Sequence, residues 1–161
     1  MDDVRRLRAR HDPARLQFPI EITVVGSSGL GWFSEGQARA DLLSRVGAVA
    51  GGFPQFSFRV KSVERFPDSN VYYLAPGTTG RFQEFQDRLA NCGLRFEPTP
   101  HAYVPHCTIA ILAQDAAEET HAEVSACPVP QEEIRVASVS FWSVNQARPI
   151  ALQGERIMLG A

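Results

Sequence analysis

The sequence lacks any apolar run long enough to span a membrane, which needs about 18 consecutive apolar residues. Its first 13 residues are rich in charge and have none of the apolar core of a secretory signal. Hydrophobic residues still make up 44% of the chain and charged residues 21%, an ordinary balance for a soluble globular protein. We therefore expect a single cytoplasmic domain over residues 1–161, with no membrane partner.

Cysteine is scarce, and its spacing excludes the usual structural uses of this residue. Three cysteines cannot all pair within one chain, and the separations between Cys92, Cys107 and Cys127 match no zinc-binding pattern. His101 and His106 lie close in sequence, but Pro105 between them prevents the shared helical face of a metal site. We expect reduced cysteines with a structural role, no metal and no other cofactor.

Lysine is nearly absent, because Lys61 is the only one and arginine supplies the other 15 of the 16 basic residues. The formal net charge is −2, so the chain has no overall basic field of the kind that attracts duplex DNA. Arginine does, however, bind phosphate through two parallel hydrogen bonds. The composition thus argues against duplex DNA as a partner and is compatible with a small phosphorylated ligand.

The order of apolar periodicities predicts an α+β domain. A strand, a helix and two strands are followed, after a further helix, by another strand, helix and two strands, which suggests two similar lobes, each with an antiparallel sheet and helices on its outer side. The expected helices cover residues 2–10, 34–49, 80–91 and 114–126, and the expected strands cover 18–26, 55–64, 71–76, 104–112, 134–144 and 150–159.

Local signals mark some of these boundaries. Ser34 with Gln37 three residues later is a capping-box pattern, which predicts that a helix begins there. Residues 67–70 carry the turn sequence Pro-Asp-Ser-Asn and predict a hairpin between the flanking strands. Gly93 is expected to end the preceding helix in a left-handed conformation.

Two polar pairs interrupt otherwise apolar strand patterns. Residues i and i+2 of a strand point to the same face, so His106 and Thr108 are expected to project together. The same spacing places Glu21 and Thr23 on one face of the first predicted strand. Each pair combines an ionisable group with a hydroxyl, which is a pattern typical of a catalytic or binding site.

These residues resemble the two-histidine phosphoesterase superfamily, which includes 2′-5′ RNA ligase-like proteins and cyclic nucleotide phosphodiesterases. The family carries two His-x-Thr-x motifs, and PHCTI over residues 105–109 matches the second one in full. FPIEITVVG over residues 18–26 looks like the first motif with Glu21 in place of the histidine. RARHDP over residues 8–13 and WSVN over residues 142–145 also fall where the family has similar segments.

The resemblance implies a bilobal fold in which two antiparallel sheets face a central cleft, with helices outside. It also implies hydrolysis of 2′,3′-cyclic phosphate nucleotides or RNA ends without a metal, with the two imidazoles as acid and base and the threonines on the phosphate oxygens. His106, Thr108, Glu21 and Thr23 are then the expected catalytic residues. Tyr103 is expected to line the cleft and stack on a base.

The glutamate in the first motif leaves the chemistry open. An ionised carboxylate at about 4 Å would repel a phosphodiester by about 1–4 kcal/mol. A protonated Glu21 would instead serve as a hydrogen-bond donor or general acid, and an ionised Glu21 would serve as a base opposite a protonated His106. An ionised Glu21 close to His106 would also raise the pKa of the imidazole.

Other interpretations remain at this point. The same cleft in a catalytically degenerate protein would bind a nucleotide or another small ligand without turnover. The cleft would bind nothing if the chain served as an interaction protein, with His106 as a core histidine and Glu21 as a solvated carboxylate. In the catalytic case we expect a monomer whose partner is a small phosphorylated nucleotide or an RNA end.

Overall fold

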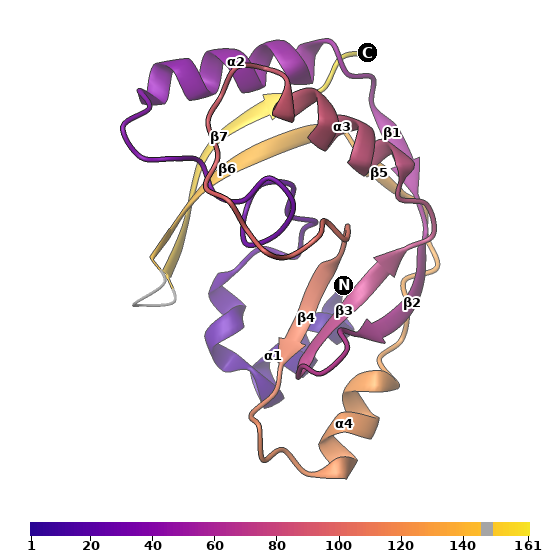
Figure 1. The fold of residues 1–161 in the computed structure, drawn as a ribbon. Coiled ribbons are helices and arrows are strands. Elements are labelled where there is room, and N and C mark those ends of the chain that lie inside the picture. Colours follow the sequence, from indigo (N-terminus) through magenta and orange to yellow (C-terminus); the bar gives the residue numbers. More distant parts are fainter. Residues whose placement is uncertain (146–149) are drawn as a thin grey trace.

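The elements of the protein are taken from a computed structural model that describes residues 1–145 and 150–161, without the side chains of residues 144, 145 and 150–153. Helices and strands are interspersed along the chain (Figure 1). In chain order they are α1 (Asp2–His11), the 3-10 helix η1 (Pro13–Gln17), α2 (Arg39–Gly51), β1 (Phe56–Phe58), β2 (Val60–Arg65), β3 (Val71–Pro76), α3 (Gly80–Ala90), β4 (Cys107–Ile111), α4 (Glu118–Ser125), β5 (Ile134–Val136), β6 (Ser138–Asn145) and β7 (Ile150–Met158).

The strands pair only in antiparallel fashion, which confirms the predicted α+β class. Within the described residues they form a three-stranded sheet in the order β2-β3-β4 and two ribbons, β1-β5 and β6-β7. Strands from the two halves of the chain pair with each other, since β4 pairs with β3 and β5 pairs with β1. The repeated order of elements had suggested that each half of the sequence forms one lobe. The strand pairing shows that it does not.

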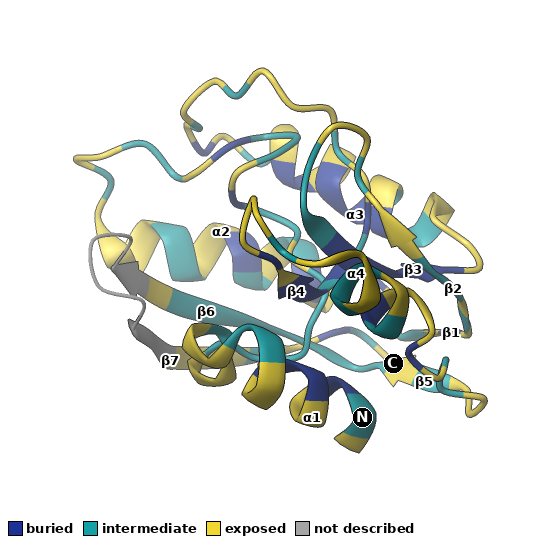
Figure 2. Cartoon of the chain, turned by 90° about the horizontal axis from the view of Figure 1, so that it is seen from below, coloured by how far each residue is buried: buried dark blue, intermediate teal, exposed yellow. Residues whose placement is uncertain are grey.

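The first hydrophobic core lies between α1, the β2-β3-β4 sheet and α4. Val4 of α1, Ile109 of β4 and Val124 of α4 are among its most deeply buried members, each at most 1% exposed. In Figure 2 the buried residues of α1 are on the inner side of the helix and the exposed residues are on the outer side. The apolar stripe of α1 therefore fixes this arginine-rich helix against the sheet that carries β4.

The second hydrophobic core lies under α2 and α3. Ala50 of α2, Leu89 of α3 and Phe53 are at most 2% exposed and pack with Val139 and Ile157 of the β6-β7 ribbon. Aromatic side chains run through this core, with the Phe53 and Phe85 rings 5.0 Å apart and edge to face. The predicted helix over residues 80–91 is confirmed, and Gly93 has the expected positive φ of 80°.

The strand predicted over residues 18–26 is wrong, because this segment pairs with no described strand. It runs between the two cores: Ile20 and Ile22 pack against the first, and Val24 and Val25 against the second. Side-chain donors bond to backbone carbonyl groups that would pair with a neighbouring strand if this segment belonged to a sheet. Arg8 donates to the Phe18 and Pro19 carbonyls, and Gln86 donates to the Val24 carbonyl at 2.9 Å.

Other boundaries differ by a few residues. The capping box is wrong, because Gln37 bonds to the backbone of Arg95 and α2 begins only at Arg39. The long strands predicted over 55–64 and 134–144 are each broken in two, at Arg59 and at Ala137. The hairpin between β2 and β3 is confirmed, and Asp68 in its turn has a positive φ of 55°, which aspartate tolerates.

Candidate functional site

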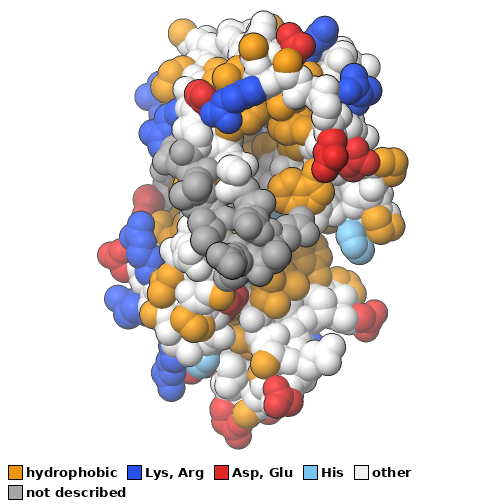
Figure 3. Space-filling model, turned by 90° about the vertical axis from the view of Figure 1, so that its left-hand side faces the viewer, with side chains coloured by type: hydrophobic (Ala, Val, Ile, Leu, Met, Phe, Trp, Pro, Cys, Tyr) orange, Lys and Arg blue, Asp and Glu red, His pale blue; other side chains and the backbone are white. Residues whose placement is uncertain are grey.

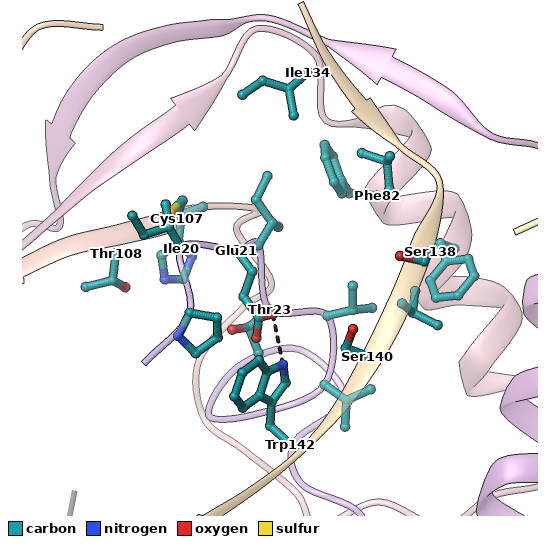
Figure 4. Close-up of a pocket in the computed structure, with 18 of the residues that line it drawn as sticks. Ile20, Glu21, Thr23, Phe82, Cys107, Thr108, Ile134, Ser138, Ser140 and Trp142 are labelled. Carbon is teal, nitrogen blue, oxygen red and sulfur yellow. Dashed lines mark hydrogen bonds between the residues drawn. The ribbon is translucent and has the colours of Figure 1, made fainter. Parts of the chain in front are cut away.

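A cavity of about 850 Å³ lies between the two cores, and the segment over residues 18–26 forms part of its wall (Figure 4). Glu21, Thr23, His106 and Thr108 all border it. The two segments that carry these residues lie close together, because the Arg8 guanidinium donates hydrogen bonds to the Phe18 carbonyl of one segment and to the Thr108 carbonyl of the other. The structure thus brings together four of the five residues that the sequence singled out.

His106 directly precedes β4, which begins at Cys107. Its Nδ1 lies 2.6 Å from the Val104 carbonyl oxygen. A carbonyl only accepts hydrogen bonds, so Nδ1 carries the hydrogen and the neutral ring keeps a free electron pair on Nε2. The edges of Phe66 and Tyr73 pack against the imidazole, with ring centroids 4.9 and 5.4 Å away, and restrict its orientation.

The protonation state of His106 follows from this environment. Burial lowers the pKa of the imidazole; the hydrogen bond to Val104 acts in the opposite direction, and the nearby Arg15 cation lowers the pKa further. The expected rise in this pKa assumed an ionised Glu21 close to the ring, and Glu21 is not among the groups that shift the pKa of His106. His106 is therefore neutral over most of the physiological pH range, with Nε2 able to accept a proton.

The pKa of Glu21 is shifted in the opposite direction from that of His106. Burial raises its pKa to about 7, and this effect exceeds the lowering by a hydrogen bond from Trp142. The Trp142 indole N–H donates to Oε2 of Glu21 at 3.0 Å, which orients the carboxyl group (Figure 4). The role of Trp142 was not predicted from the sequence; the only signal was its place in the WSVN segment.

The two threonines differ in exposure. Thr108 is half-buried on β4, and Thr23 is exposed in the irregular segment that follows Glu21. Ser138 and Ser140 add two hydroxyl groups on β6, the strand that also carries Trp142 (Figure 4). The cavity thus has hydroxyl groups on opposite walls, which suits a ligand rich in oxygen acceptors.

Arg8 connects the two motif segments, a role that the sequence did not predict. Its side chain is only 2% exposed. The guanidinium donates to the Thr108 carbonyl at 2.6 Å and to the Phe18 carbonyl at 2.8 Å, with longer bonds of 3.3 Å to Pro19 and Arg15. Burial lowers the pKa of this cation. The planar fork of one arginine thus ties the segment before Glu21 to the strand after His106.

Tyr103 is placed differently from the four residues above. It is not among the cavity-lining residues, and its hydroxyl is buried with no hydrogen-bond partner among the described residues. Burial raises the pKa of this phenol. Its side chain packs beside Gly29, whose φ is +67° and where a Cβ atom would lie 2.8 Å from that of Tyr103. Its base-stacking role remains a prediction.

The raised pKa of Glu21 predicts a pH-dependent stability. In the unfolded chain the carboxyl ionises from about pH 4.5, whereas in the folded protein it stays protonated until about pH 7. The folded state therefore binds more protons, and its stability falls as the pH rises from 4.5 through 7. We expect this fall in the free energy of unfolding to be about 1–3 kcal/mol, a value reduced for solvent access to this half-buried group. Glu21→Gln should abolish it, because its amide does not titrate.

Denaturant unfolding of wild type and Glu21→Gln at pH 5 and pH 8 measures this effect. Glu118→Gln, on the exposed first turn of α4, is the matched control and should keep the pH dependence of the wild type. An equal stability difference between wild type and Glu21→Gln at both pH values would contradict the raised pKa.

No group of three or more histidine, cysteine, aspartate and glutamate side chains is suitably placed for a metal ion in the part of the chain that is described. No described helix is long and apolar enough to cross a membrane.

On the face in Figure 3, acidic and basic side chains are intermingled around the margin, and hydrophobic side chains gather nearer the middle.

The fold is similar to that of several solved proteins. TT0787 of Thermus thermophilus has a TM-score of 0.59 and 19% identity, covering 81% of this chain and 74% of that chain. LigT of E. coli in its apo form has a TM-score of 0.55 and 17% identity, covering 100% of this chain and 93% of that chain. LigT in complex with 3′-AMP has a TM-score of 0.54 and 17% identity, covering 99% and 92%.

The comparison of sequences adds a family. No curated protein matches the chain significantly. The family model of the 2′-5′ RNA ligase superfamily, however, matches residues 2–148, a range that includes both motif segments and Trp142. The protein therefore belongs to the 2′-5′ RNA ligase superfamily of two-histidine phosphoesterases, as the PHCTI motif had indicated.

Proposed function

We propose that this protein is a metal-independent phosphodiesterase that acts on 2′,3′-cyclic phosphates of nucleotides or RNA ends, working as a monomer in the cytoplasm. The observation that carries this proposal is the opposite tuning of two acid–base groups in one cavity. Burial raises the pKa of Glu21 and lowers that of His106, and both residues border the same space. Pairs of groups tuned apart in this way are typical of acid–base catalysis.

The tuning assigns the roles. His106 is neutral with a free Nε2, so it is the general base that takes a proton from the attacking water. Glu21 is protonated below about pH 7, so it is the general acid that gives its proton to the leaving ribose oxygen. A neutral Glu21 also removes the charge repulsion that an ionised carboxylate would exert on the phosphodiester.

The reaction balances without a further reactant. Water oxygen forms a bond to phosphorus, one of the two ribose P–O bonds breaks, and the product is a ribose phosphomonoester. The proton from water ends on His106 and that from Glu21 ends on the ribose oxygen, and exchange with solvent resets both groups. Thr23 and Thr108 donate hydrogen bonds to the phosphate oxygens as charge develops on them.

The relatives support the same kind of ligand. A crystal structure of E. coli LigT contains 3′-AMP, which carries a phosphate on its ribose 3′ oxygen. The cavity here offers hydroxyl groups and an acid–base pair suited to such a ribose phosphate.

Turnover of 2′,3′-cyclic AMP and CMP in the presence of a metal chelator tests the proposal. We expect hydrolysis by the wild type and by Glu21→His, because an imidazole with an ordinary pKa near 6.5 also supplies an acid at neutral pH. Absence of turnover in both, despite a folded protein, would rule the activity out. Turnover by Glu21→His but not by the wild type would show that the glutamate abolishes catalysis and that the natural protein binds its ligand without turnover.

A further inference from the structure

The cavity continues beyond the acid–base pair into an apolar end. Phe82 and Ile134 lie at the end of the cavity that is away from Trp142 (Figure 4). Ser138 and Ser140 lie along β6, between this end and Trp142. The apolar end is formed by the cavity-lining residues Phe56, Phe58, Val60, Phe82, Ile134 and Val136.

One face of the β1-β5 ribbon forms most of this end. Phe56 lies directly opposite Val136, and Phe58 directly opposite Ile134, in the antiparallel register. Residues two apart on a strand and residues opposite each other in a pair share one face. These four apolar side chains therefore form one continuous surface.

The other face of the same ribbon is polar and points away. Ser57 and Arg135, which alternate with the apolar residues, are opposite each other in the register, and both are exposed. Arg135 borders the cavity because it lies between Ile134 and Val136, but strand alternation directs its side chain to the outer face. The surface that faces the cavity is thus free of charge.

One aromatic ring from α3 completes the apolar end. Phe82 of α3 makes edge-to-face contacts with Phe56 and Phe58, at centroid distances of 5.1 and 5.2 Å. Phe82 is only 4% exposed, which keeps its ring in place, whereas Ile134 and Val136 stay half-buried where they border the cavity. A rigid aromatic wall next to partly open aliphatic side chains suits a flat apolar ring.

We infer that this end binds the nucleobase of the substrate, and that it does so without reading the base edge. The inference rests on the proposed function, which places the phosphate near Glu21 and Thr108. A ribose then lies along Ser138 and Ser140, and the base lies against the partly open side chains of Ile134 and Val136. None of the six described residues of the apolar end has a side-chain donor or acceptor, so purines and pyrimidines are held by contact and stacking alone.

Binding measurements separate this inference from turnover. Calorimetry on the protein compares 3′-AMP and 3′-CMP with ribose 3-phosphate, which has the same phosphate position but lacks a base. We expect the two nucleotides to bind within about tenfold of each other and about 5- to 150-fold more tightly than ribose 3-phosphate, the range of one stacked base.

A matched pair of variants locates the effect. Ile134→Trp fills the apolar end and is expected to weaken binding of 3′-AMP by about the same 5- to 150-fold while leaving the affinity for ribose 3-phosphate unchanged. Ser57→Trp adds the same ring to the outer face of the same ribbon and should leave both affinities unchanged.

Each other outcome has a definite meaning. Equal affinity for 3′-AMP and ribose 3-phosphate, or a strong preference for one base, would overturn the inference and leave the proposed phosphodiesterase intact if cyclic nucleotides are still hydrolysed. Loss of ribose 3-phosphate binding in a folded Ile134→Trp variant would also overturn it. Failure of the wild type to bind any of the three ligands would reject both proposals.

Discussion

The His106→Ala variant is expected to hydrolyse 2′,3′-cyclic nucleotides about 10²- to 10⁴-fold more slowly than the wild type, the usual contribution of a general base. The loss should appear in kcat, because the imidazole acts on water in the transition state and contributes little to binding of the substrate. Initial rates at saturating substrate measure the effect. His101→Ala is the matched control, because His101 is exposed and does not border the cavity.

The pH profile distinguishes this base from the acid. Activity requires His106 to be neutral and Glu21 to be protonated, so the rate should rise along a limb below pH 6.5 and fall along a limb near pH 7. Glu21→Gln should lower the rate and remove the upper limb, since its amide neither donates a proton nor titrates. A profile that rises steadily above pH 7 in the wild type would instead assign the base role to Glu21.

Much of the site could be predicted from short-range sequence information. Thr108 lies on β4 as its apolar alternation predicted, and His106 directly precedes that strand. Glu21 and Thr23 border the same cavity although their segment is not a strand. Strand alternation and the family resemblance both placed this second pair, but the strand itself was wrong, because the apolar residues among 20–25 pack against two different cores.

The parts that could not be predicted depend on contacts between distant residues. Trp142 orients Glu21 from 121 positions further along the chain, and Arg8 reaches the backbone of Thr108 across 100 positions. The local sequence of α1 predicted an arginine-rich helix, and only the packed structure shows that Arg8 is buried while Arg10 is exposed and pairs with Glu123. The pKa values of Glu21 and His106 likewise depend on burial between the two cores.

Arg8→Met is expected to reduce both the free energy of unfolding and the rate of turnover. Removing the guanidinium leaves the carbonyls of Phe18, Pro19 and Thr108 without this donor, at about 1–3 kcal/mol for each group that water cannot reach. The variant also removes a buried cation that has no carboxylate partner among the described residues, which offsets part of that cost. We therefore expect the free energy of unfolding to fall by about 1–3 kcal/mol in total.

The effect on catalysis follows from geometry, because the hydrogen bonds of Arg8 hold together the two backbone segments that carry the motif residues. A displacement of about 1 Å between acid and base is enough to lower the rate about 100-fold. Arg8→Lys keeps the charge but cannot bond to both segments at once, so its turnover should stay low even where its stability approaches that of the wild type. Millimolar guanidinium is expected to restore turnover in Arg8→Ala, whereas Arg10→Met on the same helix should behave as the wild type. Wild-type kcat in a folded Arg8→Lys variant would show that the link between the segments does not position the acid and the base.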